Sequence, residues 1–222
     1  MLHENILRRL KEVGDAESLA GMSKFGINTK NAYGVSVTEL RKMTKKIGQN
    51  HDLAMGLWSS GVHEARILAS MVDDPDRVTE RQMDAWVRDF DSWDVCDQVC
   101  GNLFDKTEFA YKKALEWSHE KEEFVKRAGF VMMAALAVHD RGAKDKDLRR
   151  FLPIIVREAT DERNYVKKAV NWALRQIGKR NARLREEAMA TAAEIQKIDS
   201  PAAKWIAADA LRELEKKKFP VK

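Results

Sequence analysis

Residues 125–135 read VKRAGFVMMAA and residues 166–176 read VKKAVNWALRQ, and these two stretches decide the fold. In both, a valine is followed by two basic residues and an alanine, and further apolar residues recur at intervals of three and four. That spacing is typical of the buried face of an α-helix. The two stretches therefore predict two helices that repeat one pattern.

Three further stretches align with this pattern. VHEARILASMV begins at Val62, DVCDQVCGNLF begins at Asp94, and a weaker copy, AAKWIAADALR, begins at Ala202. The starts of the five copies lie 32, 31, 41 and 36 residues apart. Such spacings match helix-pair repeats of the HEAT or armadillo (ARM) type, in which each pair buries its apolar face by stacking on its neighbours. We expect an all-α superhelical solenoid of about six helix pairs, whose repeated helices line one concave face.

The composition is that of a soluble globular protein, because 44% of the 222 residues are hydrophobic and 34% are charged. Four prolines and eleven glycines favour long helices over strands. No stretch approaches the roughly 20 apolar residues of a membrane span, and the charged N-terminus shows no targeting segment. We expect a cytoplasmic monomer with one domain over residues 1–222, in which residues 1–32 form an N-terminal helical cap.

Metal and cofactor chemistry have no support in the sequence. Cys96 and Cys100 lie four residues apart on one predicted helix, too few for a disulfide framework or a zinc site. The five histidines show no metal-binding spacing, and there is no glycine-rich phosphate loop. We expect two buried thiols, no metal and no cofactor.

The positive charge is concentrated in residues 141–185. This basic block holds fourteen Lys or Arg and five Asp or Glu, a local excess of +9, so the rest of the chain sums to −4. Such an excess favours a face that meets a polyanion. A merely solvated helical surface is an equally good interpretation of the charge count alone.

The stretch 91–100, DSWDVCDQVC, carries carboxylates at positions where the other copies have small or apolar residues. A carboxylate that faces a core is costly unless it is paired or hydrogen-bonded. Asp94 can cap the start of its helix. Asp97 lies one turn further in, where a cap is less natural, and a structural salt bridge is the alternative interpretation. Its counterparts at the fourth position of the other copies are Ala65, Ala128, Ala169 and Trp205.

Aromatic and basic residues occupy equivalent positions near this acid. Trp93 lies four residues before Asp97, which places both on one helix face. Trp172 takes the seventh position of its copy, where the others have ordinary core residues. Arg127 and Lys168 share the third position, and a recurring basic residue on the concave side predicts phosphate contacts. The remaining tryptophans are interpreted as packing residues: Trp58, Trp86, Trp117 and Trp205.

From about Tyr33 to the end, over residues 33–222, the chain resembles the AlkD-like DNA alkylation repair family of HEAT-like-repeat alkylpurine DNA glycosylases. Five stretches carry the resemblance, in the family's order: YGVSVTELRKMTKKIG, HEARILASMVDD, DSWDVCDQVC, FVKRAGFVMMAAL and YVKKAVNWALRQIGKRN.

The resemblance assigns roles to individual residues. It implies that Asp97 is the catalytic carboxylate and that Trp93 accompanies it in the SWxxxD pattern. Arg127 and Trp172 fall on the family's active-site arginine and second tryptophan. Arg175, in the same motif as Trp172, falls on a residue that contacts the DNA backbone. The basic residues that we expect to bind DNA are Lys126, Lys167, Lys168, Arg175, Lys179 and Arg180.

The implied activity is that of a monofunctional DNA glycosylase, which hydrolyses the N-glycosidic bond of cationic N3- or N7-alkylated purines in duplex DNA. A fixed carboxylate would stabilise the positive charge that develops on the sugar. The alternative is a non-catalytic HEAT-repeat scaffold that binds DNA or a protein through the same face. Asp97 discriminates between the two, because a groove that only binds a polyanion should avoid a carboxylate.

Overall fold

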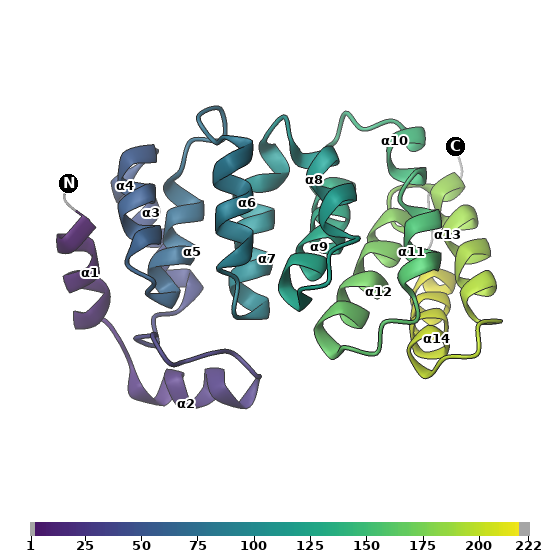
Figure 1. The fold of residues 1–222 in the computed structure, drawn as a ribbon, viewed down its shortest axis with the longest axis horizontal. Helices are drawn as coiled ribbons and strands as arrows, with labels where there is room; N and C mark the ends of the chain where they lie inside the picture. Colours follow the sequence, from purple (N-terminus) through teal and green to yellow (C-terminus); the bar gives the residue numbers. More distant parts are fainter. Residues whose placement is uncertain (1–2, 218–222) are drawn as a thin grey trace. The chain divides into compact units, whose positions relative to one another are not determined.

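The computed structural model describes residues 3–217, and within this range every regular element is helical. The chain forms two compact units, one up to Thr107 and one from Glu108 onward (Figure 1). The all-α prediction is confirmed, and the described residues contain no strand.

The first unit has α5 packed mainly on α3, α4 and α7. Its helix α2 lies crosswise to the others in Figure 1. The bounds of its elements are α1 (His3–Glu12), α2 (Ala16–Lys24), α3 (Val37–Ile47), α4 (His51–Ser59), α5 (His63–Val72), α6 (Glu80–Arg88), α7 (Trp93–Asn102) and the 3-10 helix η1 (Phe104–Lys106).

The second unit is organised around α9 and α12, which pack along each other. Helix α8 packs on α9, and α13 and α14 pack on α12. The bounds are α8 (Ala110–Trp117), α9 (Glu123–His139), α10 (Asp145–Arg149), α11 (Leu152–Glu158), α12 (Asn164–Gly178), α13 (Ala182–Ile195) and α14 (Pro201–Lys216).

Polar residues before the apolar runs set where several helices begin. Their side-chain oxygens accept a hydrogen bond from a backbone N–H in the first turn, which has no partner within the helix. The residues that act in this way are Asp15, Ser36, Asn50, Thr79, Asn181 and Ser200.

The five repeated stretches all fall at the starts of helices, namely α5, α7, α9, α12 and α14. Helices that adjoin in sequence form packed pairs, as α4 and α5, α8 and α9, and α13 and α14 do. The repeated helices also pack on one another within each unit, α5 on α7 and α12 on both α9 and α14. The predicted helix-pair organisation is therefore present in each unit.

The registers of two copies differ from the sequence alignment. On α7 the buried stripe is Val95, Cys96, Val99 and Cys100, so Asp97 lies beside the core and is partly exposed. The expectation that Asp97 replaces a core alanine is therefore wrong. On α14 the burial pattern of α12 recurs one residue later than aligned. Ala203, Ile206 and Ala207 take the places of Val166, Ala169 and Val170.

The tryptophan predictions hold for three of the four packing residues. Trp58, Trp86 and Trp117 are buried, and the rings of Trp58 and Trp86 stack at 3.9 Å. Trp205 is 40% exposed, so its assignment as a packing residue is wrong. It lies off the apolar stripe of α14, which smaller side chains already fill. The two cysteines are buried free thiols, as predicted.

Gly129 permits the close packing of α8 against α9. A Cβ atom added to Gly129 would lie 2.4 Å from the backbone nitrogen of Ser118, far inside van der Waals contact. The backbone of α9 therefore rests directly on the end of α8, two residues after Arg127.

Candidate functional site

Trp93 and Asp97 lie one turn apart on α7 in the first unit, on the same side of the helix. Both are partly exposed, whereas Val95 and Cys96 between them are buried. The indole Nε1 of Trp93 donates a hydrogen bond to the carbonyl of Phe25, at 3.1 Å. The structure thus holds the predicted aromatic–carboxylate pair at the edge of the core, where solutes can reach it.

The segment that follows α2 holds the start of α7. The Asn28 side-chain amide donates to Asp91 Oδ2 at 2.7 Å, and the Asn28 backbone nitrogen lies 3.4 Å from Ser92 Oγ. With the bond from Trp93 to Phe25, three contacts tie this segment to the first turn of α7. The sequence interpretation gave residues 1–32 no part in the site. The polar GINTKN break was the signal that could have indicated one.

Asp94 pairs with a buried histidine. His63 Nε2 lies 2.8 Å from Asp94 Oδ2, and the Ser92 hydroxyl donates to Asp94 Oδ1 at 2.6 Å. Burial would raise the pKa of Asp94, but the hydrogen bond and the charge of His63 outweigh burial, so the pKa of Asp94 lies below its usual value. Burial likewise opposes protonation of His63, yet Asp94 raises the pKa of His63 above its usual value. This ion pair, absent from the sequence interpretation, anchors the turn that carries Trp93.

A buried carboxylate, Glu64, fixes the entry to α3. It accepts hydrogen bonds from the backbone nitrogens of Tyr33, Gly34 and Val35, at 2.7 to 3.2 Å. These N–H donors satisfy the carboxylate inside the unit, so Glu64 has a structural role.

The other two residues of the predicted catalytic set, Arg127 and Trp172, lie in the second unit. Arg127 on α9 is 5% exposed, and its Nη1 donates to the carbonyl of Tyr165 at 2.6 Å. This bond links α9 to the first turn of α12. Trp172, two turns along α12, is partly exposed between the buried Asn171 and Ala173. Trp172 therefore differs from the fully buried residues aligned with it: Leu68, Cys100 and Val131.

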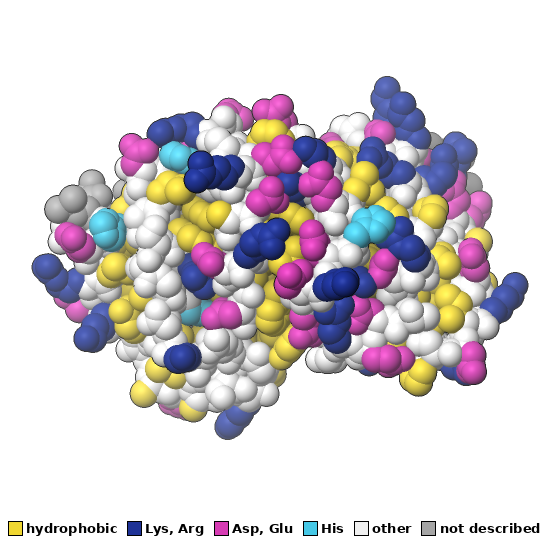
Figure 2. Space-filling view, in the orientation of Figure 1, with side chains coloured by type: hydrophobic (Ala, Val, Ile, Leu, Met, Phe, Trp, Pro, Cys, Tyr) yellow, Lys and Arg dark blue, Asp and Glu magenta, His cyan; other side chains and the backbone are white. Residues whose placement is uncertain are grey.

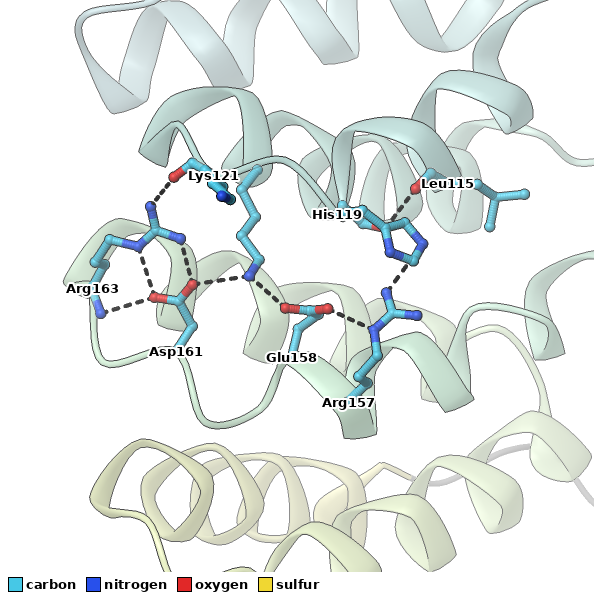
Figure 3. Close-up of polar contacts among 9 residues, drawn as sticks. Leu115, His119, Lys121, Arg157, Glu158, Asp161 and Arg163 are labelled. Atoms are coloured by element: carbon cyan, nitrogen blue, oxygen red, sulfur yellow. Dashed lines mark hydrogen bonds and ion pairs between the residues drawn. The ribbon is translucent and has the colours of Figure 1, made fainter.

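Lys126, a predicted DNA contact, belongs to an ion-pair cluster with Glu158 and Asp161, and Figure 3 shows these two acids with Arg157 and Arg163. Its ammonium group pairs with Glu158 and lies 3.2 Å from Asp161 Oδ2. Arg163 binds both oxygens of Asp161, at 2.9 and 2.6 Å, and donates to the carbonyl of Lys121. Burial would raise the pKa of Glu158 and of Asp161, but these bonds hold both below their usual values. The cluster joins the start of α9 to the loop between α11 and α12.

Three further predicted DNA contacts also have partners within the protein. Arg175 pairs with Glu213 and lies 3.7 Å from Asp209, and Lys179 pairs with Glu213 as well. Arg180 donates to the carbonyls of two residues on or just after α9, Ala137 and Asp140.

Lys167 and Lys168 are in a different situation. The Lys167 ammonium lies 5.4 Å from the centre of the Trp205 ring. Lys168 is exposed, and within residues 3–217 it has no ion pair or hydrogen bond from its side chain. Of the six predicted DNA contacts, Lys168 is therefore the one best placed to meet a phosphate.

Carboxylates outside the basic block offset much of its charge. Arg149 binds Glu187 through two hydrogen bonds. Glu213 forms ion pairs with both Arg175 and Lys179. On the face drawn in Figure 2, basic and acidic side chains are interspersed. Any polyanion-binding surface must therefore depend on individual unpaired cations rather than on the block as a whole.

Two kinds of feature are absent from the part of the chain that the structure describes. Residues 3–217 contain no group of three or more His, Cys, Asp or Glu side chains that could hold a metal ion. None of their helices is long and apolar enough to cross a membrane.

Comparison with solved structures finds the same fold elsewhere. The structure matches a protein described as belonging to "a new family of proteins related to the HEAT-like repeat DNA glycosylases with affinity for branched DNA structures". The match has a TM-score of 0.79 and 20% sequence identity, and it covers 96% of this chain and 95% of the other. This likeness confirms the predicted HEAT-like repeat fold.

Comparison at the level of sequence identifies the family. No curated protein matches the chain. The family model for "DNA alkylation repair enzyme" matches residues 6–214, nearly the whole chain. The match begins well before Tyr33, so it takes in most of α1 and all of α2, which the resemblance in the sequence left out. The chain belongs to the DNA alkylation repair enzyme family.

Proposed function

We propose that the protein is a monofunctional DNA glycosylase that hydrolyses the N-glycosidic bond of N3- or N7-alkylated purines in duplex DNA. One observation carries the proposal beyond family membership. Trp93 and Asp97 reach the surface together, with Val95 and Cys96 between them buried, and the residues around them hold the first turn in place. Such support is typical of a side chain that must be held in position for chemistry.

The chemistry needs little more than a fixed anion. An alkylated purine is cationic and already a good leaving group, so cleavage places positive charge on the deoxyribose. The Asp97 carboxylate would stabilise that charge and orient the attacking water, as carboxylates do in sugar hydrolysis. The indole face of Trp93 would lie against the cationic nucleotide, a contact of about 1 kcal/mol or more when it is desolvated.

The second unit would supply contacts to the DNA backbone. Lys168 would bind a phosphate as an unpaired cation, and the partly exposed Trp172 would offer a second aromatic surface. In our proposal Arg127 acts mainly by holding the first turn of α12. DNA as the ligand agrees with the affinity for branched DNA named for the matched structure. We propose a cytoplasmic monomer that acts without a cofactor.

The decisive experiment is base release by the Asp97→Asn variant. Purified protein is incubated with duplex DNA that contains 7-methylguanine or 3-methyladenine, and the free base is measured. The substitution keeps the size of the side chain and removes its charge. We expect excision to fall by roughly 10²-fold or more, the effect of removing a preorganised electrostatic group. Binding of lesion DNA should be retained.

Asp76→Asn is the matched control, because Asp76 is an exposed carboxylate of the same unit, on the loop between α5 and α6. Its excision rate should equal that of the wild type. If folded Asp97→Asn excises bases as fast as the wild type, the catalytic assignment is wrong. If neither the wild type nor Asp97→Asn releases any base but both bind DNA, the non-catalytic scaffold is the better description.

A further inference from the structure

Trp205 is a surface tryptophan that the packing of α14 does not require. The buried face of this helix is formed by Ala203, Ile206, Ala207 and Ala210, whereas Trp205 is 40% exposed. A single exposed apolar side chain is ordinary on a protein surface. What sets Trp205 apart is the charge beside it, because the Lys167 ammonium lies against its ring.

The register of the repeats places Trp205 in a position that suits a ligand. In the corrected alignment of α14 on α12, Ala203 takes the place of Val166, and Trp205 takes the place of Lys168. Lys168 is the exposed, unpaired cation of α12. Because α12 and α14 pack on each other, the repeat presents a cation from one helix and an aromatic ring from the next.

The charges around the indole favour an anionic ligand. The Lys167 ammonium lies 5.4 Å from the ring centre. The nearest acid on α14, Asp209, is engaged by Arg212 and lies 3.7 Å from Arg175. A lysine beside an exposed aromatic ring, followed in sequence by a second, exposed lysine, supplies the two elements by which proteins hold single-stranded nucleic acid: cations along the backbone and a ring on which a base can stack.

We propose that Trp205, Lys167 and Lys168 form a binding site for an unpaired nucleotide of DNA. The base would stack on the indole and displace the Lys167 ammonium from the ring toward the adjoining phosphate. Lys168 would bind the next phosphate along the strand. The site would accept any base, since every base offers a flat aromatic face. The inference rests on the proposed binding of DNA but does not depend on catalysis at Asp97.

The experiment compares two fluorescently labelled DNAs by anisotropy. One is an intact duplex, and the other is the same duplex interrupted by a short gap of unpaired thymidines. The wild type should bind the gapped DNA more tightly. Trp205→Leu should lose that preference, with gapped-DNA affinity reduced by roughly tenfold, because stacking on an aromatic residue contributes about this factor per base. Trp205→Phe should keep most of it, and Lys167→Gln should reduce it in part.

Val138→Ala is the matched control, because Val138 is an exposed apolar residue on α9 in the same unit. It should bind both DNAs as the wild type does. The inference is overturned if Trp205→Leu keeps the full preference, or if the wild type binds both DNAs equally. If the wild type binds neither DNA, the proposed function fails together with the inference. Base release from an intact alkylated duplex should be unchanged in Trp205→Leu, which separates this site from the catalytic one.

Discussion

At the scale of single residues, the His63–Asp94 pair makes stability depend on pH. The pKa of Asp94 is lowered in the folded state, so its contribution is present above the ordinary aspartate pKa and is lost as the pH falls through the lowered value. The pKa of His63 is raised, so its contribution is present below the ordinary histidine pKa and is lost as the pH rises through the raised value. The pair should therefore contribute most between roughly pH 4 and pH 6.5.

We expect Asp94→Asn to lower the free energy of unfolding by about 1–3 kcal/mol in that window. The difference from the wild type should become smaller as the pH rises through the raised pKa of His63, where His63 loses its charge. Urea unfolding of both proteins at a series of pH values measures this. A difference that does not change between about pH 5 and pH 8 would show that His63 is not charged in the pair.

The sequence could indicate individual site residues but not their partners. Trp93 and Asp97 share a helix face because of their spacing alone, and the structure agrees. The partners of Asp94, Lys126 and Arg175 lie 31 to 38 residues away on other helices. Such pairings depend on how the helices pack on one another. The spacing of residues along a single helix carries no information about that packing. For this reason four cations expected to meet DNA are instead bound within the protein: Lys126, Arg175, Lys179 and Arg180.

At the scale of helices, the contact between α8 and α9 can be tested through Gly129. Replacing a glycine in a helix by alanine usually stabilises a protein by up to about 1 kcal/mol. Here the added methyl group would meet the rigid backbone of Ser118, so we expect Gly129→Ala to destabilise the fold by about 1–3 kcal/mol. Gly21→Ala on α2 is the control, since nothing lies within 4 Å of the added atom and a small gain is expected. Thermal melting of both variants decides the matter, and a stabilised Gly129→Ala would contradict the packing.

Helix positions were predicted better than helix registers. All five repeated stretches begin where helices begin. The reason is that polar residues interrupt the apolar periodicity between helices, and such interruptions mark helix ends reliably. For α7 and α14 the sequence alignment assigned the wrong side of the helix to the core, and the reason is physical. Small residues such as alanine fit both the core and its edge, so an alignment built on them does not determine which side of the helix is buried.

At the scale of the whole molecule, we expect a modest dependence of DNA affinity on salt, because four of the six predicted DNA contacts are bound within the protein. Each phosphate contact contributes about 0.9 to the slope of log affinity against log salt concentration. We expect Lys168→Gln to weaken duplex binding and to lower this slope by about 0.9, with an unchanged melting temperature. Lys126→Gln is the contrast: it should lower the melting temperature, because Glu158 and Asp161 lose a partner, and should leave the slope unchanged. The opposite pattern would place the phosphate contact at Lys126.

The burial of Cys96 and Cys100 limits how readily electrophiles can modify these two cysteines. Reagents that methylate purines also methylate thiolates, and they react with the deprotonated sulfur. Both sulfurs are out of reach of solvent, and burial raises the pKa of the Cys100 thiol well above its usual value. The folded chain thus presents no accessible thiol within residues 3–217. Under the proposed function, the protein would meet the agents that alkylate DNA, and burial protects its two thiols from them.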